Sequence, residues 1–195
     1  MSMSIPRTIA YRASLLLCLV ALPAMADEYT QPLTDLAKGK IAEIAANPEL
    51  VAAVVAQNAV TGAYDQARVD ALDAQWRAEV DADAKPLIDA TLNNAASKYL
   101  SAAQDESAGL FTEVFVTDAK GLNVAQSTIT SDYWQGDEEK YTESFARGAG
   151  AIHIGEVEQD ESTQAFQKQV SITITDPVSG APIGSLTVGV DLSLI

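Results

Sequence analysis

The segment AFQKQVSITIT, residues 165–175, decides the fold class because its apolar and polar side chains alternate. The apolar positions are Phe166, Val170, Ile172 and Ile174, and the polar positions are Gln167, Gln169, Ser171 and Thr173. Lys168 is the one exception on the apolar side. A period of two is the spacing of a β-strand that buries one face. The segment therefore predicts a strand in a half-buried sheet.

Further strand and turn signals lie on both sides of this segment. Residues 176–182, DPVSGAP, predict a hairpin connection into a strand over 183–192, where Leu186, Val188 and Val190 stay in phase. Upstream, β-branched and aromatic residues are dense, and the turn DAKG interrupts them. The remaining strands are expected at residues 111–117, 122–127 and 148–158.

The residues before about position 108 have helical periodicity. One apolar stripe recurs at three- and four-residue spacing: Leu33, Leu36, Ala37, Ile41, Ile44 and Ala45. Asn47 and Pro48 predict a cap and a first-turn proline, and Thr61 and Gly62 predict the end of that second helix. Further helices are expected over 65–81 and from Pro86 to Leu100. Helices followed by an antiparallel sheet indicate one α+β domain, mainly helical over 27–108 and mainly sheet over 109–195.

The N-terminus has the pattern of a secretory signal peptide. Arg7 and Arg12 precede an apolar run at 13–22, and Ala24-Met25-Ala26 fits an A-x-A cleavage site. The run is shorter than the roughly 20 residues of a membrane span. We expect cleavage after Ala26, which divides the chain into a signal peptide (1–26) and a periplasmic or secreted domain (27–195). An uncleaved anchor, or a lipid on Cys18, is the alternative.

Composition excludes several classes of function. The chain has 12 basic and 27 acidic residues, and cleavage after Ala26 would leave 10 basic and 27 acidic. This acidity argues against binding nucleic acid or anionic lipid surfaces. With one histidine and one cysteine, which lies in the signal peptide, the chain has few ligands for zinc or haem, and its acidic clusters lack the spacing of a calcium loop. No metal and no cofactor is therefore expected.

The loop SDYWQGDE, residues 131–138, is the strongest functional signal in the sequence. Adjacent aromatics in a loop must either fold inward or offer a contact surface. We predict that Asp132, Tyr133, Trp134 and Asp137 contact a ligand. The alternatives are that Trp134 belongs to the core and that Asp137 caps a helix beginning near residue 138.

A second group of predicted ligand contacts lies on the sheet. Gln169, Ser171 and Thr173 would line a cavity if the apolar face of their strand meets the N-terminal helices, and they would otherwise be solvated. Trp76, on a helical apolar stripe, is expected in the core. His153, in an apolar run, is expected to be an ordinary strand residue.

Five stretches together resemble the extracytoplasmic Cache (PDC, PAS-like) sensor domains of bacterial chemoreceptors and histidine kinases. They are NPELV at 47–51 continuing through Gln57 and Asn58, LDAQWR at 72–77, FVTDAKG at 115–121, DYWQGDE at 132–138 and PIGSLTVGVD at 182–191. The resemblance implies a long N-terminal helix and short helices packed on a five-stranded antiparallel PAS-like sheet. Amino-acid-binding members carry an arginine in the loop, whereas none lies between Lys120 and Lys140 here, and Arg147 is the nearest candidate.

Members of this family usually sit between two membrane helices, and we expect a stand-alone periplasmic protein without its own output module. The leading hypothesis is a module that binds a small polar molecule and passes its ligand state to a membrane receptor, kinase or transporter. A protein-interaction scaffold without a small ligand is the alternative. No catalytic residue is predicted, because no nucleophile motif accompanies His153. A homodimer through the N-terminal helix is expected by analogy with the membrane-bound members.

Overall fold

The computed structural model describes residues 28–159 and 164–195, so the predicted signal peptide lies outside the described residues. The described chain is an α+β domain in which helices precede a five-stranded antiparallel sheet. This confirms the fold class and the order of elements that the resemblance to Cache sensor domains implies. Among the described residues, no helix combines the length and the apolar character needed to cross a membrane.

The helical half begins with a continuous helix formed by α1 (Thr30–Leu36), a wider π-helical turn (Ala37–Ile41) and α2 (Ala42–Ala45). Four separate helices follow: α3 (Pro48–Thr61), α4 (Gln66–Val80), α5 (Pro86–Leu92) and α6 (Ala95–Glu106). Asn47 caps α3 as predicted, because its Oδ1 accepts a hydrogen bond from Glu49 N at 2.8 Å ahead of Pro48 in the first turn. Asp65 caps α4 in the same way by accepting from Arg68 N at 2.9 Å.

One predicted helix is divided in two. The sequence pattern predicts a single helix from Pro86 to Leu100, but α5 ends at Leu92 and α6 begins at Ala95. Asn94 between them has extended backbone angles, and its Oδ1 accepts a hydrogen bond from Ser97 N at 2.7 Å. The break therefore has a local cause, since a side chain that caps a new helix competes with continuation of the old one.

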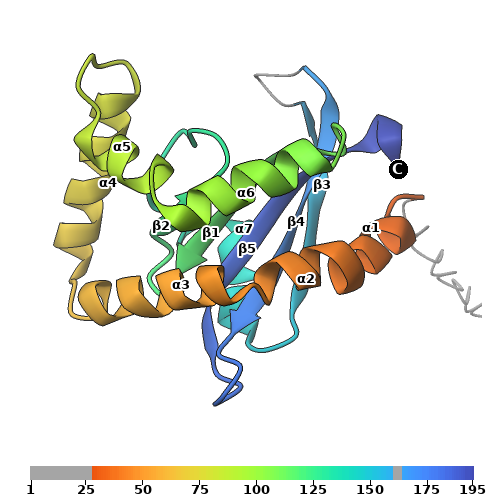
Figure 1. Cartoon of the computed structure of the whole chain (residues 1–195), viewed down its shortest axis with the longest axis horizontal. Coiled ribbons are helices and arrows are strands. Elements are labelled where there is room, and N and C mark those ends of the chain that lie inside the picture. Colours follow the sequence, from red (N-terminus) through yellow and green to blue (C-terminus); the bar gives the residue numbers. More distant parts are fainter. Residues whose placement is uncertain (1–27, 160–163) are drawn as a thin grey trace, which may run out of the picture.

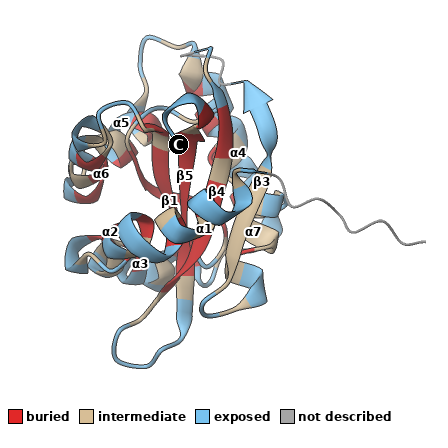
Figure 2. Ribbon diagram, turned by 90° about the vertical axis from the view of Figure 1, so that its right-hand side faces the viewer, coloured by how far each residue is buried: buried red, intermediate tan, exposed pale blue. Residues whose placement is uncertain are grey.

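The sheet has the strand order β2-β1-β5-β4-β3, and every pair of neighbours is antiparallel. The strands are β1 (Phe111–Asp118), β2 (Asn123–Gln126), β3 (Ile152–Gln159), β4 (Phe166–Thr175) and β5 (Pro182–Asp191). The third strand starts later than predicted because Gly148 and Gly150 have positive φ angles of 97° and 80°, which turn the chain before it. Strands β1, β5 and β4 are largely buried, whereas β3 forms a half-exposed edge (Figure 2).

The predicted alternation separates the two faces of the sheet. The apolar face of β4, with Val170, Ile172 and Ile174, packs in one core with the N-terminal helix, α3 and α6. These helices cross one face of the sheet, as Figure 1 shows. On the opposite face, Ser171 Oγ pairs with Thr187 Oγ1 at 2.9 Å. A short helix, α7 (Glu139–Thr142), and a 3-10 turn, Phe145–Arg147, pack on that face.

A second core joins α4 and α5 to the end of the sheet. Its buried members are Val69, Leu72, Trp76, Ile88, Leu122 and Tyr133. Trp76 is fully buried, as the helical stripe predicts. This smaller core places the predicted loop 131–138 against the helices and away from the middle of the sheet.

Candidate functional site

The start of loop 131–138 is held by α4. The Tyr133 ring stacks on Trp76 with ring centroids 5.2 Å apart. Asp73 Oδ1 accepts hydrogen bonds from Tyr133 N at 2.9 Å and from Trp134 N at 3.1 Å. Trp76 Nε1 donates to Thr130 O at 2.9 Å. One helix therefore fixes both the backbone of the loop and the plane of its first aromatic ring.

Trp134 closes the loop onto the turn that follows β1. Its Nε1 donates to Lys120 O at 2.9 Å, and its backbone forms a bridge with Leu122. Gly121, with a φ of 81°, lies so close to Gly136 that a Cβ on Gly121 would stand 2.6 Å from Gly136 Cα. The half-buried indole thus has a structural role in this corner of the fold.

Asp132 is likewise bound within the protein. Its Oδ1 accepts a hydrogen bond from Gln135 Nε2 at 2.6 Å, and its Oδ2 lies 3.4 Å from Arg77 Nη2. These contacts tie the loop to itself and to α4.

Two other predicted residues, Asp137 and Gln169, line one pocket between α7 and the polar face of the sheet. We call it the sheet-face pocket, and its volume is about 380 Å³. Its lining residues are Asp137, Glu138, Glu139, Lys140, His153, Gly155, Glu156, Glu158 and Gln169. Strands β3 and β4 supply one wall and the segment around α7 supplies the other. Predicted residues from the loop and from the sheet therefore meet here.

Hydrogen bonds and ion pairs order the floor of the sheet-face pocket. Gln169 Nε2 donates to Glu113 Oε1 at 2.7 Å, which fixes the amide and leaves its oxygen as an acceptor. Lys140 Nζ lies 3.0 Å from Glu138 Oε2 and 5.5 Å from the centre of the Phe115 ring. The side chain of Lys140 is only 18% exposed, so its charge is held over the sheet. The remaining carboxylates of the lining outnumber this single ammonium group.

The remaining predicted contacts lie outside this pocket. Ser171 is buried in its pair with Thr187, and Thr173 Oγ1 donates to Gly148 O at 2.8 Å. Arg147 is exposed and forms a two-point contact with Glu143, at 2.7 and 2.9 Å. The α7 helix begins at Glu139 after residue 138, so Asp137 does not occupy the cap position.

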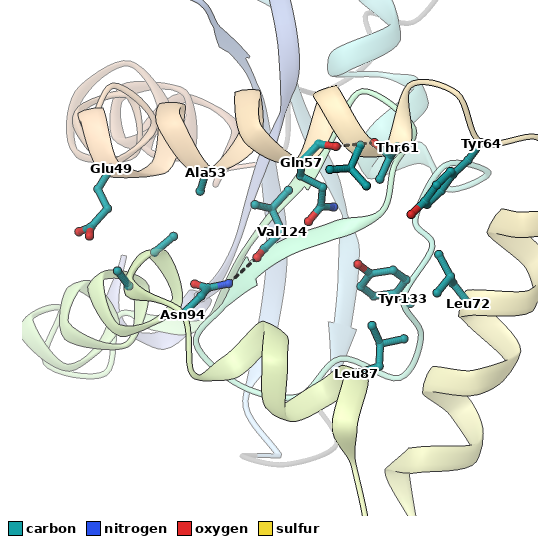
Figure 3. A pocket seen from close by; sticks show the side chains of 13 residues that line it. Glu49, Ala53, Gln57, Thr61, Tyr64, Leu72, Leu87, Asn94, Val124 and Tyr133 are labelled. Carbon is teal, nitrogen blue, oxygen red and sulfur yellow. Dashed lines mark hydrogen bonds between the residues drawn. The ribbon is translucent and has the colours of Figure 1, made fainter.

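Tyr133 lines a different pocket, on the helical side of the sheet. This helical-side pocket has a volume of about 580 Å³ and lies between α3, α4, α5, α6 and β2 (Figure 3). Sequence reasoning did not select its polar residues Gln57, Thr61 and Tyr64 as ligand contacts, although Gln57 lies in one of the five stretches that resemble Cache domains. The structure thus assigns two predicted residues of loop 131–138, Tyr133 and Asp137, to separate pockets.

Metal chemistry has no candidate centre in the described part of the chain. Within residues 28–159 and 164–195, no group of three or more histidine, cysteine, aspartate or glutamate side chains is placed to hold a metal ion. The acidic side chains of the sheet-face pocket are arranged around a cleft and do not converge on one point.

Comparison with known proteins gives matches by structure only. No family model matches the sequence, and no curated protein matches it. Among 35 matching chains of solved structures is the ligand-binding domain of the Campylobacter jejuni chemoreceptor Tlp3 in complex with 4-methylisoleucine. The identity is 14% and the TM-score 0.41, over 80% of this chain and 62% of that one.

Two sensor domains give similar values. The sensor domain of the V. cholerae histidine kinase DctB is 13% identical with a TM-score of 0.40, over 86% of this chain and 58% of that chain. The E. coli DcuS sensor domain is 20% identical with a TM-score of 0.38, over 67% of this chain and 95% of that one. This chain thus spans about 60% of the length of the first two structures. The three structures named here are a chemoreceptor ligand-binding domain and two sensor domains.

Proposed function

We propose that this protein is an extracytoplasmic sensor-type domain that binds a small polar molecule in the sheet-face pocket. The observation that carries the proposal is the meeting of Asp137 and Gln169 in one pocket, since one comes from the loop and the other from the polar sheet face. A ligand there would touch both α7 and the sheet. Its binding would therefore change how the α7 segment lies on the sheet.

The charges of the lining favour a small cation. Five carboxylates, those of Asp137, Glu138, Glu139, Glu156 and Glu158, line the pocket together with a single lysine, which is already paired with Glu138. An ammonium group would gain charge-assisted hydrogen bonds from such a lining, whereas a carboxylate would meet like charge. Arg147, which the resemblance suggests for a carboxylate ligand, is paired with Glu143 at the surface.

In this proposal the protein acts after export, and a separate membrane receptor, kinase or transporter reads its ligand state. The sequence signals of a cleaved leader and an acidic mature domain support the location. The apolar stripe of the N-terminal helix packs in the core, where Leu33 and Ile41 are fully buried. A homodimer through that helix would therefore use its polar outer side.

A thermal-shift screen tests the proposal. We would compare small amines, amino acids, organic acids and sugars, each added to the purified protein. A ligand at about 100 times its Kd adds about 2.7 kcal/mol to the free energy of unfolding. For a domain of this size that corresponds to a rise in Tm of about 5 to 10 °C. We expect a rise confined to the amines.

Matched variants test whether the rise in Tm depends on the sheet-face pocket. Replacing Asp137→Asn together with Gln169→Leu should remove the rise, whereas Asp70→Asn, an exposed acid on α4, should preserve it. A response that survives the double variant would place the ligand elsewhere. A flat response to every class would contradict ligand binding at this pocket and favour the alternative function, a protein-interaction scaffold.

A further inference from the structure

The helical-side pocket carries a set of chemical groups that the proposed function does not use. It is lined by residues different from those of the sheet-face pocket: Glu49, Ala53, Gln57, Val60, Thr61, Tyr64, Leu72, Leu87, Asn94, Ala95, Ala96, Val124 and Tyr133. The two pockets lie on opposite faces of the sheet. Whatever occupies one therefore makes no direct contact with the lining of the other.

The hydroxyl group of a largely buried tyrosine points into the helical-side pocket. The Tyr133 side chain is 7% exposed, and its stacking on Trp76 fixes the plane of the ring. Figure 3 shows the Tyr133 hydroxyl facing the space between α3 and Leu87, with the Tyr64 hydroxyl directed toward the same space. In the described part of the chain, no hydrogen-bond partner reaches the Tyr133 hydroxyl. Burial, together with the nearby Asp118 carboxylate, raises the pKa of this phenol, so it stays protonated and is a donor.

Gln57 supplies an acceptor to the same space. Its Nε2 donates to Asp118 Oδ2 at 3.0 Å, and it also lies within hydrogen-bonding distance of Leu122 O at 3.3 Å and Asn123 O at 3.2 Å. These contacts direct the amide nitrogen toward the sheet and engage both of its hydrogens. The amide oxygen consequently faces the pocket, as Figure 3 shows, and within the described residues nothing donates to it.

The walls around these two polar groups are mostly apolar. They are formed by Ala53, Val60, Leu72, Leu87, Ala95, Ala96 and Val124. The charged side chain in the lining is Glu49, on the first turn of α3, and the buried carboxylate of Asp118 lies behind Gln57 and Thr61. With no cationic group in the lining, an anionic ligand would lose its hydration without gaining a counter-charge.

We propose that the helical-side pocket is a second small-molecule site, specific for an uncharged ligand with an apolar body and a head group that accepts from Tyr133 and donates to Gln57. A primary carboxamide on an aromatic or aliphatic ring has this pattern. The pocket volume of about 580 Å³ accommodates such a molecule, and pockets of this kind combine apolar walls with a few fixed polar groups. This site is independent of the proposed cation site.

The test is an NMR titration of the isotopically labelled protein with benzamide and, separately, with benzoate, which has nearly the same shape but carries a charge. Benzamide should shift the backbone amide signals of Thr61, Tyr64, Val124 and Tyr133, and benzoate at equal concentration should not. Tyr133→Phe should weaken benzamide binding about three- to tenfold, the effect of losing one neutral hydrogen bond. Because that hydroxyl has no partner among the described residues, its removal should not unfold the protein.

Two further variants make the result decisive. Val60→Trp, at a position that is 60% exposed at the edge of the pocket, should block benzamide without unfolding the protein. Tyr99→Phe on α6 removes a hydroxyl outside the lining and should leave binding unchanged. Absence of shifts at the lining residues, equal binding of benzoate, or unchanged affinity in Tyr133→Phe would each overturn the proposal.

Discussion

Burial and two neighbouring groups all raise the pKa of the Tyr133 phenol. Burial raises its pKa, and the Asp118 carboxylate and the Tyr64 phenol raise it further. In the unfolded chain a tyrosine has a pKa of about 10. The unfolded protein therefore releases this proton at a lower pH than the folded protein does. The resulting contribution to stability is fully present below about pH 10 and is lost as the pH rises toward the folded pKa.

The free energy of unfolding should accordingly fall as the pH rises above about 10, and Tyr133→Phe should make that fall shallower. Urea denaturation at several pH values between about 8 and 11 measures the free energy of unfolding, and phenolate absorbance is a second readout. Tyr141→Phe should act in the same direction, since burial also raises the pKa of Tyr141. Identical curves for the wild type and Tyr133→Phe at the alkaline end would contradict the expectation.

At the same residue scale, the sequence indicated which loop to examine but not what its side chains contact. An aromatic pair between acidic residues is unusual in a loop, and Tyr133 does line a pocket. Its neighbours there, Gln57 and Thr61, lie on a helix far away in the sequence, and only the packing of α3 on the sheet brings them close. Trp134, another predicted ligand contact, donates a hydrogen bond to Lys120 O within the fold.

Among the elements, α4 acts as a clamp on loop 131–138 through Asp73. Its Oδ1 accepts from Tyr133 N and Trp134 N, and its Oδ2 accepts from Arg77 Nε at 2.8 Å. Asp73→Ala should leave two backbone N–H groups without this partner and cost about 1–3 kcal/mol of stability. The amides of Tyr133 and Trp134 should then exchange with deuterium much faster, whereas amides in β4 should be less affected.

Asp70→Ala provides the matched control for this clamp. Asp70 lies one turn earlier on α4, is exposed, and accepts a hydrogen bond from Gln66 Nε2 at 2.7 Å. Its replacement should leave exchange at Tyr133 and Trp134 unchanged. Equal exchange rates in Asp73→Ala and the wild type would show that the stacking on Trp76 alone holds the loop.

The sequence predicted best those elements whose position is set by a single local pattern of residues. The alternation in 165–175 predicted β4 and the packing of Val170, Ile172 and Ile174 in the core, and the Asn47-Pro48 pair predicted the start of α3. The break before α6 was missed because apolar residues continue at helical spacing across it. The capping pattern of Asn94 with Ser97 was present in the sequence but weaker than that periodicity. Pocket positions could not be predicted, since they depend on how α4, α5 and α7 pack.

Taken as a whole molecule, the protein carries a large excess of negative charge for its size. The formal net charge is −15, from 27 acidic and 12 basic residues. The ion pair between Arg147 and Glu143 is exposed at the surface, and pairs of this kind contribute little. Most carboxylates therefore repel one another across the surface, and this repulsion opposes the compact state more than the expanded one.

Salt should stabilise the protein, because it screens this repulsion. The Debye length falls from about 30 Å at 0.01 M to about 8 Å at 0.15 M ionic strength. We expect Tm to rise by about 2–4 °C over this range, equivalent to about 1 kcal/mol. The rise should be smaller near pH 5, where carboxylates begin to bind protons, and similar for different monovalent salts. A Tm that falls with added salt at neutral pH would mean that attractive ion pairs outweigh the repulsion among the surface carboxylates.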